Sequence, residues 1–126
     1  MVKHESRPGP RVAIVTGAGT GLGRAYARRL AADGLRVMVN NRRREIDAAG
    51  RGSADLVVEE IHAAGGEAIA NYEDVCAAGA GERMVEQALA TWGRLDALVN
   101  NAGVDQHAAF HKIDLEAFRH IFDVNF

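Results

Sequence analysis

An apolar run that breaks into a glycine-rich turn is the feature that most constrains the fold of this chain. Residues 12–15 (VAIV) are followed by residues 16–23 (TGAGTGLG), where a helical pattern begins. A helix N-terminus carries unpaired N–H groups and a partial positive charge, both of which suit a phosphate. Glycines let the backbone approach such a ligand closely. The turn therefore predicts a nucleotide site at the end of a buried strand.

The rest of the chain repeats this order of strand and helix. Ser53 and Asp114 are expected N-caps, and the first helix is expected to place Leu22, either Ala25 or Tyr26, and Leu30 on one face. The expected strands cover 11–16, 36–40, 67–72 and 95–99, and the expected helices cover 22–33, 53–64, 84–92 and the stretch after 114. Strands joined by helices imply parallel pairing with right-handed crossovers. The predicted fold class is α/β, a doubly wound parallel sheet.

Composition places limits on the function. With 126 residues, 48% of them hydrophobic and 25% charged, we expect one globular domain over residues 11–126 after a flexible segment over residues 1–10. A net charge of −2 argues against a nucleic-acid partner, and no apolar run approaches the length of a membrane span.

Cys76 is the only cysteine and is expected to be a small packed residue. A chain without an internal disulfide suits a reducing, cytoplasmic compartment. His107 and His111 lack the pattern of a metal site, so no metal is expected.

Small and hydrogen-bonding residues follow three of the expected strands. Gly17 to Gly23 follow the first, Asp74 and Val75 follow the third, and residues 100–103 (NNAG) follow the fourth. Ligands of open α/β sheets bind beyond the carboxyl ends of the strands. The three segments therefore predict one binding site at that edge.

The spacing of the glycines excludes two common phosphate loops. A Walker loop requires a second glycine five residues after the first, followed by Lys and Ser or Thr, and neither Leu22 nor Arg24 meets that requirement. The G-x-G-x-x-G fingerprint also fails, because Leu22 stands where its third glycine belongs. The pattern that remains is T-G-x-x-x-G-x-G.

This pattern, with Asp74-Val75, the NNAG segment and Asn125, resembles the ordered motifs of the short-chain dehydrogenases/reductases from about Arg11 onward. Residues 37–72 resemble the (3R)-hydroxyacyl-CoA dehydrogenase modules of multifunctional β-oxidation enzymes. The resemblance implies a Rossmann-type sheet and a nicotinamide cofactor. It implies cofactor contacts from Thr16, Gly17, Gly21, Leu22, Gly23, Asp74, Val75, Asn101, Ala102 and Gly103. Asp74 would accept from the adenine amino group, and Val75 would pack beside the ring.

The end of the second expected strand bears on the choice between NAD and NADP. A carboxylate there accepts from the ribose 2′-hydroxyl of NAD, whereas a cation accommodates the 2′-phosphate of NADP. The β-oxidation modules carry an Asp at the position of Asn41, and this chain continues with Arg42 and Arg43. Asn does not repel a phosphate, and an arginine can pair with it. NADP(H) is therefore favoured over NAD(H), with Asn41 and Arg42 as cofactor-binding residues. A solvated face for the arginines remains the alternative.

Asn125 is the only family catalytic residue that this chain offers. It is expected on one apolar helical stripe with Leu115, Phe118 and Phe122, where a buried amide needs hydrogen-bond partners. In the family this Asn holds a water in a proton relay to the catalytic lysine. The expected helix begins with a hydrophobic staple of Ile113 and Phe118.

The other catalytic groups of the family are absent from these 126 residues. The family uses a Ser, and a Tyr with a Lys four residues later, whereas Tyr26 and Tyr72 are followed at that distance by Leu30 and Cys76. The chain is therefore expected to be the N-terminal part of a longer oxidoreductase acting on an alcohol or carbonyl, and inactive alone. The longer form would be a homo-oligomer. The alternative is a catalytically incomplete chain that acts at most as a dinucleotide-binding module.

Overall fold

The structure, a computed structural model, describes residues 8–42, 46–103, 110–112 and 114–126. Strands and helices alternate along the chain, and each predicted element is present with bounds shifted by a few residues. The elements are β1 (Val12–Val15), α1 (Gly21–Ala32), β2 (Arg36–Asn40), α2 (Ser53–Ala63), β3 (Glu67–Asn71), α3 (Ala80–Trp92), β4 (Ala97–Val99), a 3₁₀ turn (Phe110–Lys112) and α4 (Leu115–Asn125). This order confirms the predicted α/β class.

The four strands form one parallel sheet in the order β3-β2-β1-β4. The chain moves outward from β1 through β2 to β3 and then returns to the other side of β1 to form β4. The point where the strand order reverses therefore lies between β1 and β4, which is where open α/β sheets bind ligands.

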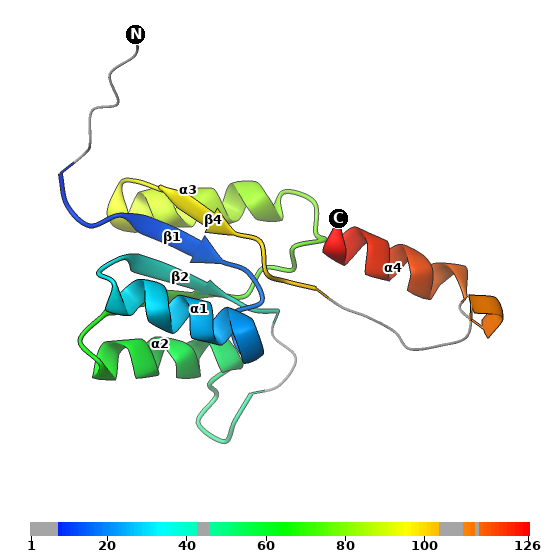
Figure 1. Cartoon of the computed structure of the whole chain (residues 1–126), viewed down its shortest axis with the longest axis horizontal. Coiled ribbons are helices and arrows are strands. Elements are labelled where there is room, and N and C mark those ends of the chain that lie inside the picture. Colours follow the sequence, from blue (N-terminus) through cyan, green and yellow to red (C-terminus); the bar gives the residue numbers. More distant parts are fainter. Residues whose placement is uncertain (1–7, 43–45, 104–109, 113) are drawn as a thin grey trace, which may run out of the picture.

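Helices cover both faces of the sheet, as Figure 1 shows. On one face α1 and α2 pack Ala27, Val57 and Ile61 against Val15 and neighbouring strand residues. On the other face α3 packs Met84 and Ala88 against Val12, Ile14 and Met38. Successive residues of a strand point to opposite faces, so a continuous apolar run fills both cores. The sheet is doubly wound, as predicted.

The buried face of α1 is not the predicted apolar face. Gly23, Ala27 and Ala31 are buried, whereas Leu22 and Tyr26 are 68% and 43% exposed. Small residues let the helix lie close to the sheet and to α2. A Cβ at Gly23 would strike the carbonyl oxygen of Gly17, so the helix begins directly against the turn.

The two expected N-caps have different outcomes. Asp114 caps α4, because its side chain accepts from the Ala117 N–H at 2.7 Å. Ser53 is instead the first residue of α2, and Gly52 occupies the cap position. The Ser53 hydroxyl contacts Asn41 at 2.6 Å instead of its own helix.

The apolar stripe of α4 is not buried. Leu115, Phe118 and Phe122 are 62%, 52% and 55% exposed, and Asn125 is also exposed. The helix lies beyond the arrowheads of the strands in Figure 1, where no sheet face covers it. Ile113, the partner predicted for Phe118, lies outside the described residues, as do Arg43 and His107. Among the residues that are described, no helix is long and apolar enough to span a bilayer.

Candidate functional site

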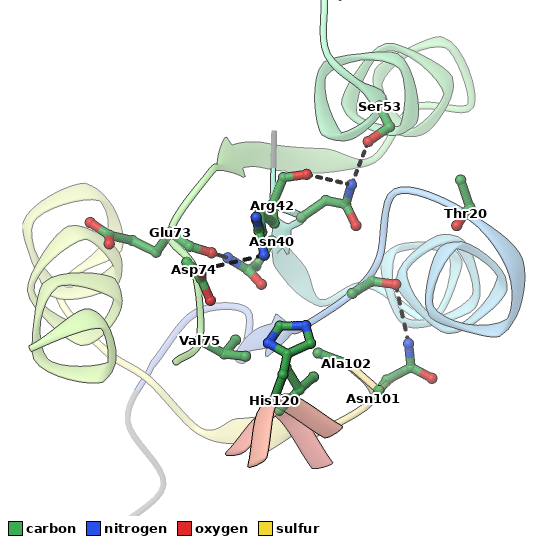
Figure 2. Close-up of a pocket in the computed structure, with 14 residues that line it drawn as sticks. Thr20, Asn40, Arg42, Ser53, Glu73, Asp74, Val75, Asn101, Ala102 and His120 are labelled. Carbon is green, nitrogen blue, oxygen red and sulfur yellow. Dashed lines mark hydrogen bonds and ion pairs between the residues drawn. The ribbon is translucent and has the colours of Figure 1, made fainter. Parts of the chain in front are cut away.

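A pocket of about 580 Å³ lies at the carboxyl ends of the strands. Gly17 comes from the turn after β1, Asn41 from the end of β2, Asp74 from the end of β3 and Ala102 from the end of β4. The full lining is Gly17, Thr20, Asn40, Asn41, Arg42, Ser53, Glu73, Asp74, Val75, Asn101, Ala102, Gly103, His120 and Val124. Figure 2 shows these side chains gathered around one space. The predicted convergence of three strand ends is present, and the end of β2 joins them.

The turn after β1 adopts a conformation that requires glycine. Gly17 and Gly21 have φ angles of 61° and 57°, which non-glycine residues rarely adopt. A Cβ at Gly17 would lie 2.8 Å from the Cα of Ala102, so this glycine also lets the ends of β1 and β4 approach each other.

The N-terminus of α1 begins at this turn without a side-chain cap. The N–H of Arg24 donates to the Thr20 carbonyl at 3.2 Å, and the Thr20 side chain makes no cap bond. The N–H groups before Arg24 therefore precede the helical hydrogen-bond ladder. A glycine cradle at an uncapped helix N-terminus fits a pyrophosphate.

Thr16 joins the ends of β1 and β4 from below the pocket. Its side chain is buried, and its hydroxyl oxygen accepts from the N–H groups of Asn101 and Ala102 at 3.1 and 3.0 Å. The hydroxyl in turn lies 3.4 Å from the Val99 carbonyl, to which it donates. Thr16 thus holds the segment that lines the pocket but does not line it.

Asn101 closes the same junction from the other side. Its side-chain amide donates to the carbonyl oxygens of Thr16 and Gly17 at 3.2 and 3.1 Å. Asn101 therefore ties the end of β4 to the end of β1, and it also lines the pocket.

The end of β2 places polar groups and the Arg42 guanidinium at the pocket. Asn41 donates to the Ser53 hydroxyl at 2.6 Å, and a Cβ at Gly19 would strike both side chains. The Arg42 guanidinium lies 3.6 Å from the Asp74 carboxylate across the pocket, and half of the Arg42 side chain is exposed. Asn41, which stands at the position of an Asp in the β-oxidation modules, is therefore flanked by a hydroxyl group and a guanidinium group.

Local interactions shift the pKa values of Glu73, which lines the pocket, and of Cys76, which lies beside it. The Arg83 guanidinium lowers the pKa of the Glu73 carboxyl by hydrogen bonding to it, so Glu73 is ionised at neutral pH. Local desolvation and the Asp74 carboxylate both raise the pKa of the Cys76 thiol. Cys76 is exposed, in contrast to the packed position expected for it. No group of three metal-ligating side chains occurs among the described residues.

Several predicted site residues lie beside the pocket without lining it. These are Thr16, Gly21, Leu22, Gly23 and Asn125. Asn125 still lies close: a Cβ at Gly103 would be 2.9 Å from its Oδ1. Its amide is exposed at the end of α4, which contradicts the expectation of a buried polar site.

Six lining residues were not predicted: Thr20, Asn40, Ser53, Glu73, His120 and Val124. Asn40 had a sequence signal, because it is a polar residue directly after the apolar residues 37–39 (VMV). His120 and Val124 lie four residues apart on α4, and the spacing of residues gives no indication that this helix approaches the strand ends.

The sequence of this chain is similar to those of known proteins. The family model of the short chain dehydrogenases matches residues 11–126. An uncharacterized oxidoreductase of Methylorubrum extorquens is 49% identical over 115 residues, which are 91% of this chain and 44% of that protein. Peroxisomal multifunctional enzyme type 2 of mouse is 49% identical over 108 residues, 84% of this chain and 14% of that enzyme.

The fold of this chain is similar to that of a solved structure. A metagenomic short-chain oxidoreductase in complex with NADP has a TM-score of 0.80 and 36% identity, over 93% of this chain and 50% of that one. The chain therefore spans half or less of the length of these relatives. The match of the family model over nearly the whole chain, together with this likeness, shows that the chain belongs to the short-chain dehydrogenase family.

Proposed function

We propose that the pocket binds NADP(H), and that the chain forms the cofactor-binding part of an oxidoreductase acting on an alcohol or carbonyl. The observation that carries the proposal is the meeting of four strand ends around one pocket beside an uncapped helix N-terminus. A bound nicotinamide cofactor supplies or accepts the hydride. The residues of this chain bind and orient the rest of the cofactor.

Each part of the dinucleotide has a counterpart in the pocket. Asp74 and Val75 form the proposed adenine subsite, and Asn101, Ala102 and Gly103 border the proposed ribose. The turn from Gly17 to Gly23 would receive the pyrophosphate on its N–H groups.

The preference for NADP(H) rests on the end of β2. Asn41, Ser53 and Arg42 surround the region beside that strand end, and none of the three is acidic. A 2′-phosphate there would gain a charge-assisted hydrogen bond from Arg42, in competition with its present partner Asp74. The metagenomic relative was solved with NADP.

The reaction and the substrate belong to the whole protein. The resemblance of residues 37–72 to (3R)-hydroxyacyl-CoA dehydrogenase modules supports a 3-hydroxyacyl or 3-oxoacyl thioester as substrate. Asn125 would hold a water of the proton relay, and the proposal includes a homo-oligomeric longer form in the cytoplasm. The alternative is a dinucleotide-binding module without turnover, because neither tyrosine of this chain is followed by a lysine four residues later. Oxidation of NADPH by the longer form of the protein in the presence of a 3-oxoacyl thioester would favour the enzyme.

Titration with NADPH and NADH tests the cofactor proposal. We expect the wild-type chain to bind NADPH at least about tenfold more tightly, since a hydrogen bond to a charged group contributes about 1.5–3 kcal/mol. Arg42→Ala should remove most of this preference by weakening NADPH binding while leaving NADH binding unchanged. Fluorescence of the reduced nicotinamide measures both affinities.

Arg51→Ala is the matched control. Arg51 pairs with Asp47 and Glu59 and does not line the pocket, so its removal should leave the preference intact. Equal or tighter binding of NADH by the wild-type chain would contradict the proposal of NADP(H).

A further inference from the structure

Two buried amide side chains lie at the ends of neighbouring strands, and one of them, Asn40, lines the pocket. Asn40 ends β2 and is 1% exposed, and Asn71 ends β3 and is 6% exposed. Burial of an amide without hydrogen bonds is unfavourable, so its partners show what the group does. The Nδ2 of Asn40 donates to the Oδ1 of Asn71 at 2.7 Å.

This pair of amides holds the backbone of Glu73. The N–H of Glu73 donates to the Oδ1 of Asn71 at 3.0 Å, and the carbonyl of Glu73 accepts from the Nδ2 of Asn40 at 3.0 Å. Both polar groups of one residue in the loop are therefore fixed by side chains from the sheet. The bond from Asn40 is drawn in Figure 2.

Helix α3 anchors the same segment from the other side. The Oε1 of Gln87 accepts from the Nδ2 of Asn71 at 2.7 Å, and its Nε2 donates to the Ala70 carbonyl at 3.3 Å. Arg83, one turn earlier on the same helical face, donates to both oxygens of the Glu73 carboxylate at 2.7 and 2.9 Å. Helix α3, β3 and β2 thus converge on Glu73.

The residue after Glu73 is the proposed adenine contact. Asp74 turns its Oδ1 back to the Cys76 N–H at 2.9 Å, and its Oδ2 lies on the side of Arg42. A hydrogen bond to a base requires that this carboxylate be held within a fraction of an ångström. Glu73 directly precedes Asp74 in the chain. Its N–H is bound by Asn71, and Asn71 is in turn bound by Gln87.

We propose that Asn71 and Gln87 are positioning residues for base recognition, acting through Glu73 on the Asp74 carboxylate. The inference rests on the proposed function. In it, Asn71 and Gln87 enable the site to distinguish a purine with an amino group at position 6 from one without it. They touch no part of the ligand themselves. A merely structural pair would support binding of every dinucleotide equally.

Comparison of NADPH with its hypoxanthine analogue, deamino-NADPH, separates these two roles. The analogue carries a carbonyl oxygen in place of the amino group, so it has no donor at position 6 and can offer Asp74 only its N1–H. We expect the wild-type chain to bind NADPH about tenfold more tightly than the analogue, as for a hydrogen bond to a charged group. Gln87→Leu and Asn71→Ala should reduce this ratio to below about threefold. Isothermal titration with each ligand gives the ratio.

Two further variants make the comparison specific. Gln87→Glu keeps an acceptor facing the Nδ2 of Asn71, so it should retain most of the ratio that Gln87→Leu loses. His62→Ala removes a contact with Ala68 at the opposite end of β3 and should leave the ratio unchanged. Leucine is a good helix former, so Gln87→Leu should fold, and circular dichroism confirms this.

Each outcome has a definite meaning. Equal weakening of both ligands by Gln87→Leu and Asn71→Ala, with the wild-type ratio preserved, would overturn the positioning role while leaving the proposed function standing. A wild-type ratio near one would show that the site does not discriminate the amino group at position 6 and would overturn it as well. A wild-type chain that binds neither dinucleotide would overturn the proposed function and this inference with it.

Discussion

At the scale of single residues, Thr16 is the hydroxyl on which the junction of β1 and β4 depends. Thr16→Val keeps the shape of the side chain but leaves the N–H groups of Asn101 and Ala102 without their acceptor. An unsatisfied buried donor costs about 1–3 kcal/mol. We expect the free energy of unfolding in urea to fall by about 2 kcal/mol.

Two other threonine variants serve as comparisons for Thr16→Val. Thr16→Ser retains the hydroxyl and removes one methyl group, so it should cost about 1 kcal/mol. Thr91→Ala removes a hydroxyl that is exposed on α3 and should change stability by less than about 0.5 kcal/mol. If Thr16→Val were as stable as Thr91→Ala, the two hydrogen bonds would not hold the junction.

Individual residues also mark the limit of sequence-based prediction at the site. The glycines, Asp74 and the NNAG segment were predictable because turn chemistry and the ends of strands are local properties. The contact of Asn41 with Ser53 was not, because it joins residues twelve positions apart across a long connection. Which side chains meet across the pocket is decided by tertiary packing.

At the scale of elements, an ion pair fastens the start of β1 to the segment before β4. The Asp96 carboxylate accepts from Arg94 at 2.7 Å and from the Val12 N–H at 2.8 Å. The Arg94 bond, followed by the Val12 bond, lowers the pKa of Asp96 from 3.8 to about 2. Arg94 also donates to the carbonyl oxygens of Pro8 and Gly9, which lie within the segment predicted to be flexible.

This lowered pKa makes the junction sensitive to acid. Because the folded state binds the Asp96 proton more weakly than the unfolded state, the stabilisation is complete above about pH 4 and is lost as pH falls toward about 2. Asp96→Asn should therefore be less stable than the wild-type chain at pH 7, with a difference that shrinks toward pH 2. Urea midpoints measured across this range test the prediction.

Asp33→Asn is the control for Asp96→Asn, since it removes another ion-paired aspartate, at the exposed end of α1. It should follow the wild-type pH profile. A constant difference between wild-type and Asp96→Asn chains at every pH would contradict the assignment of the acid-sensitive contact to Asp96.

Helix α1 explains why the elements themselves were easier to predict than their faces. Strand and helix patterns with glycine stops gave its position to within one residue of Gly21–Ala32. Large apolar residues were expected to share one face, yet the buried positions hold Gly23, Ala27 and Ala31. Close approach to the turn and to the sheet selects small side chains, a requirement that hydrophobic periodicity does not reveal.

At the scale of the whole molecule, the double winding followed from the sequence but the placement of α4 did not. Alternating strands and helices leave parallel pairing as the simplest arrangement, and the doubly wound sheet confirms it. The hydrophobic period of α4 predicted one apolar stripe on the helix but not what lies against it. Whether a stripe is buried depends on what the rest of the molecule places against it, and in this structure the stripe is exposed.

The exposed stripe of α4 leads to a prediction about the behaviour of the chain in solution. Phe118, Phe122 and Phe126 follow one another along the helix, with ring centroids 6.4 and 5.1 Å apart, and each is more than half exposed. An apolar surface of this kind favours association. The double variant Phe118→Gln/Phe122→Gln should therefore reduce concentration-dependent association in sedimentation velocity. The matched control is Val85→Gln/Leu89→Gln, which changes two half-exposed apolar residues at the same spacing on α3. Equal association of the two double variants would assign the effect to general surface hydrophobicity and not to the aromatic stripe of α4.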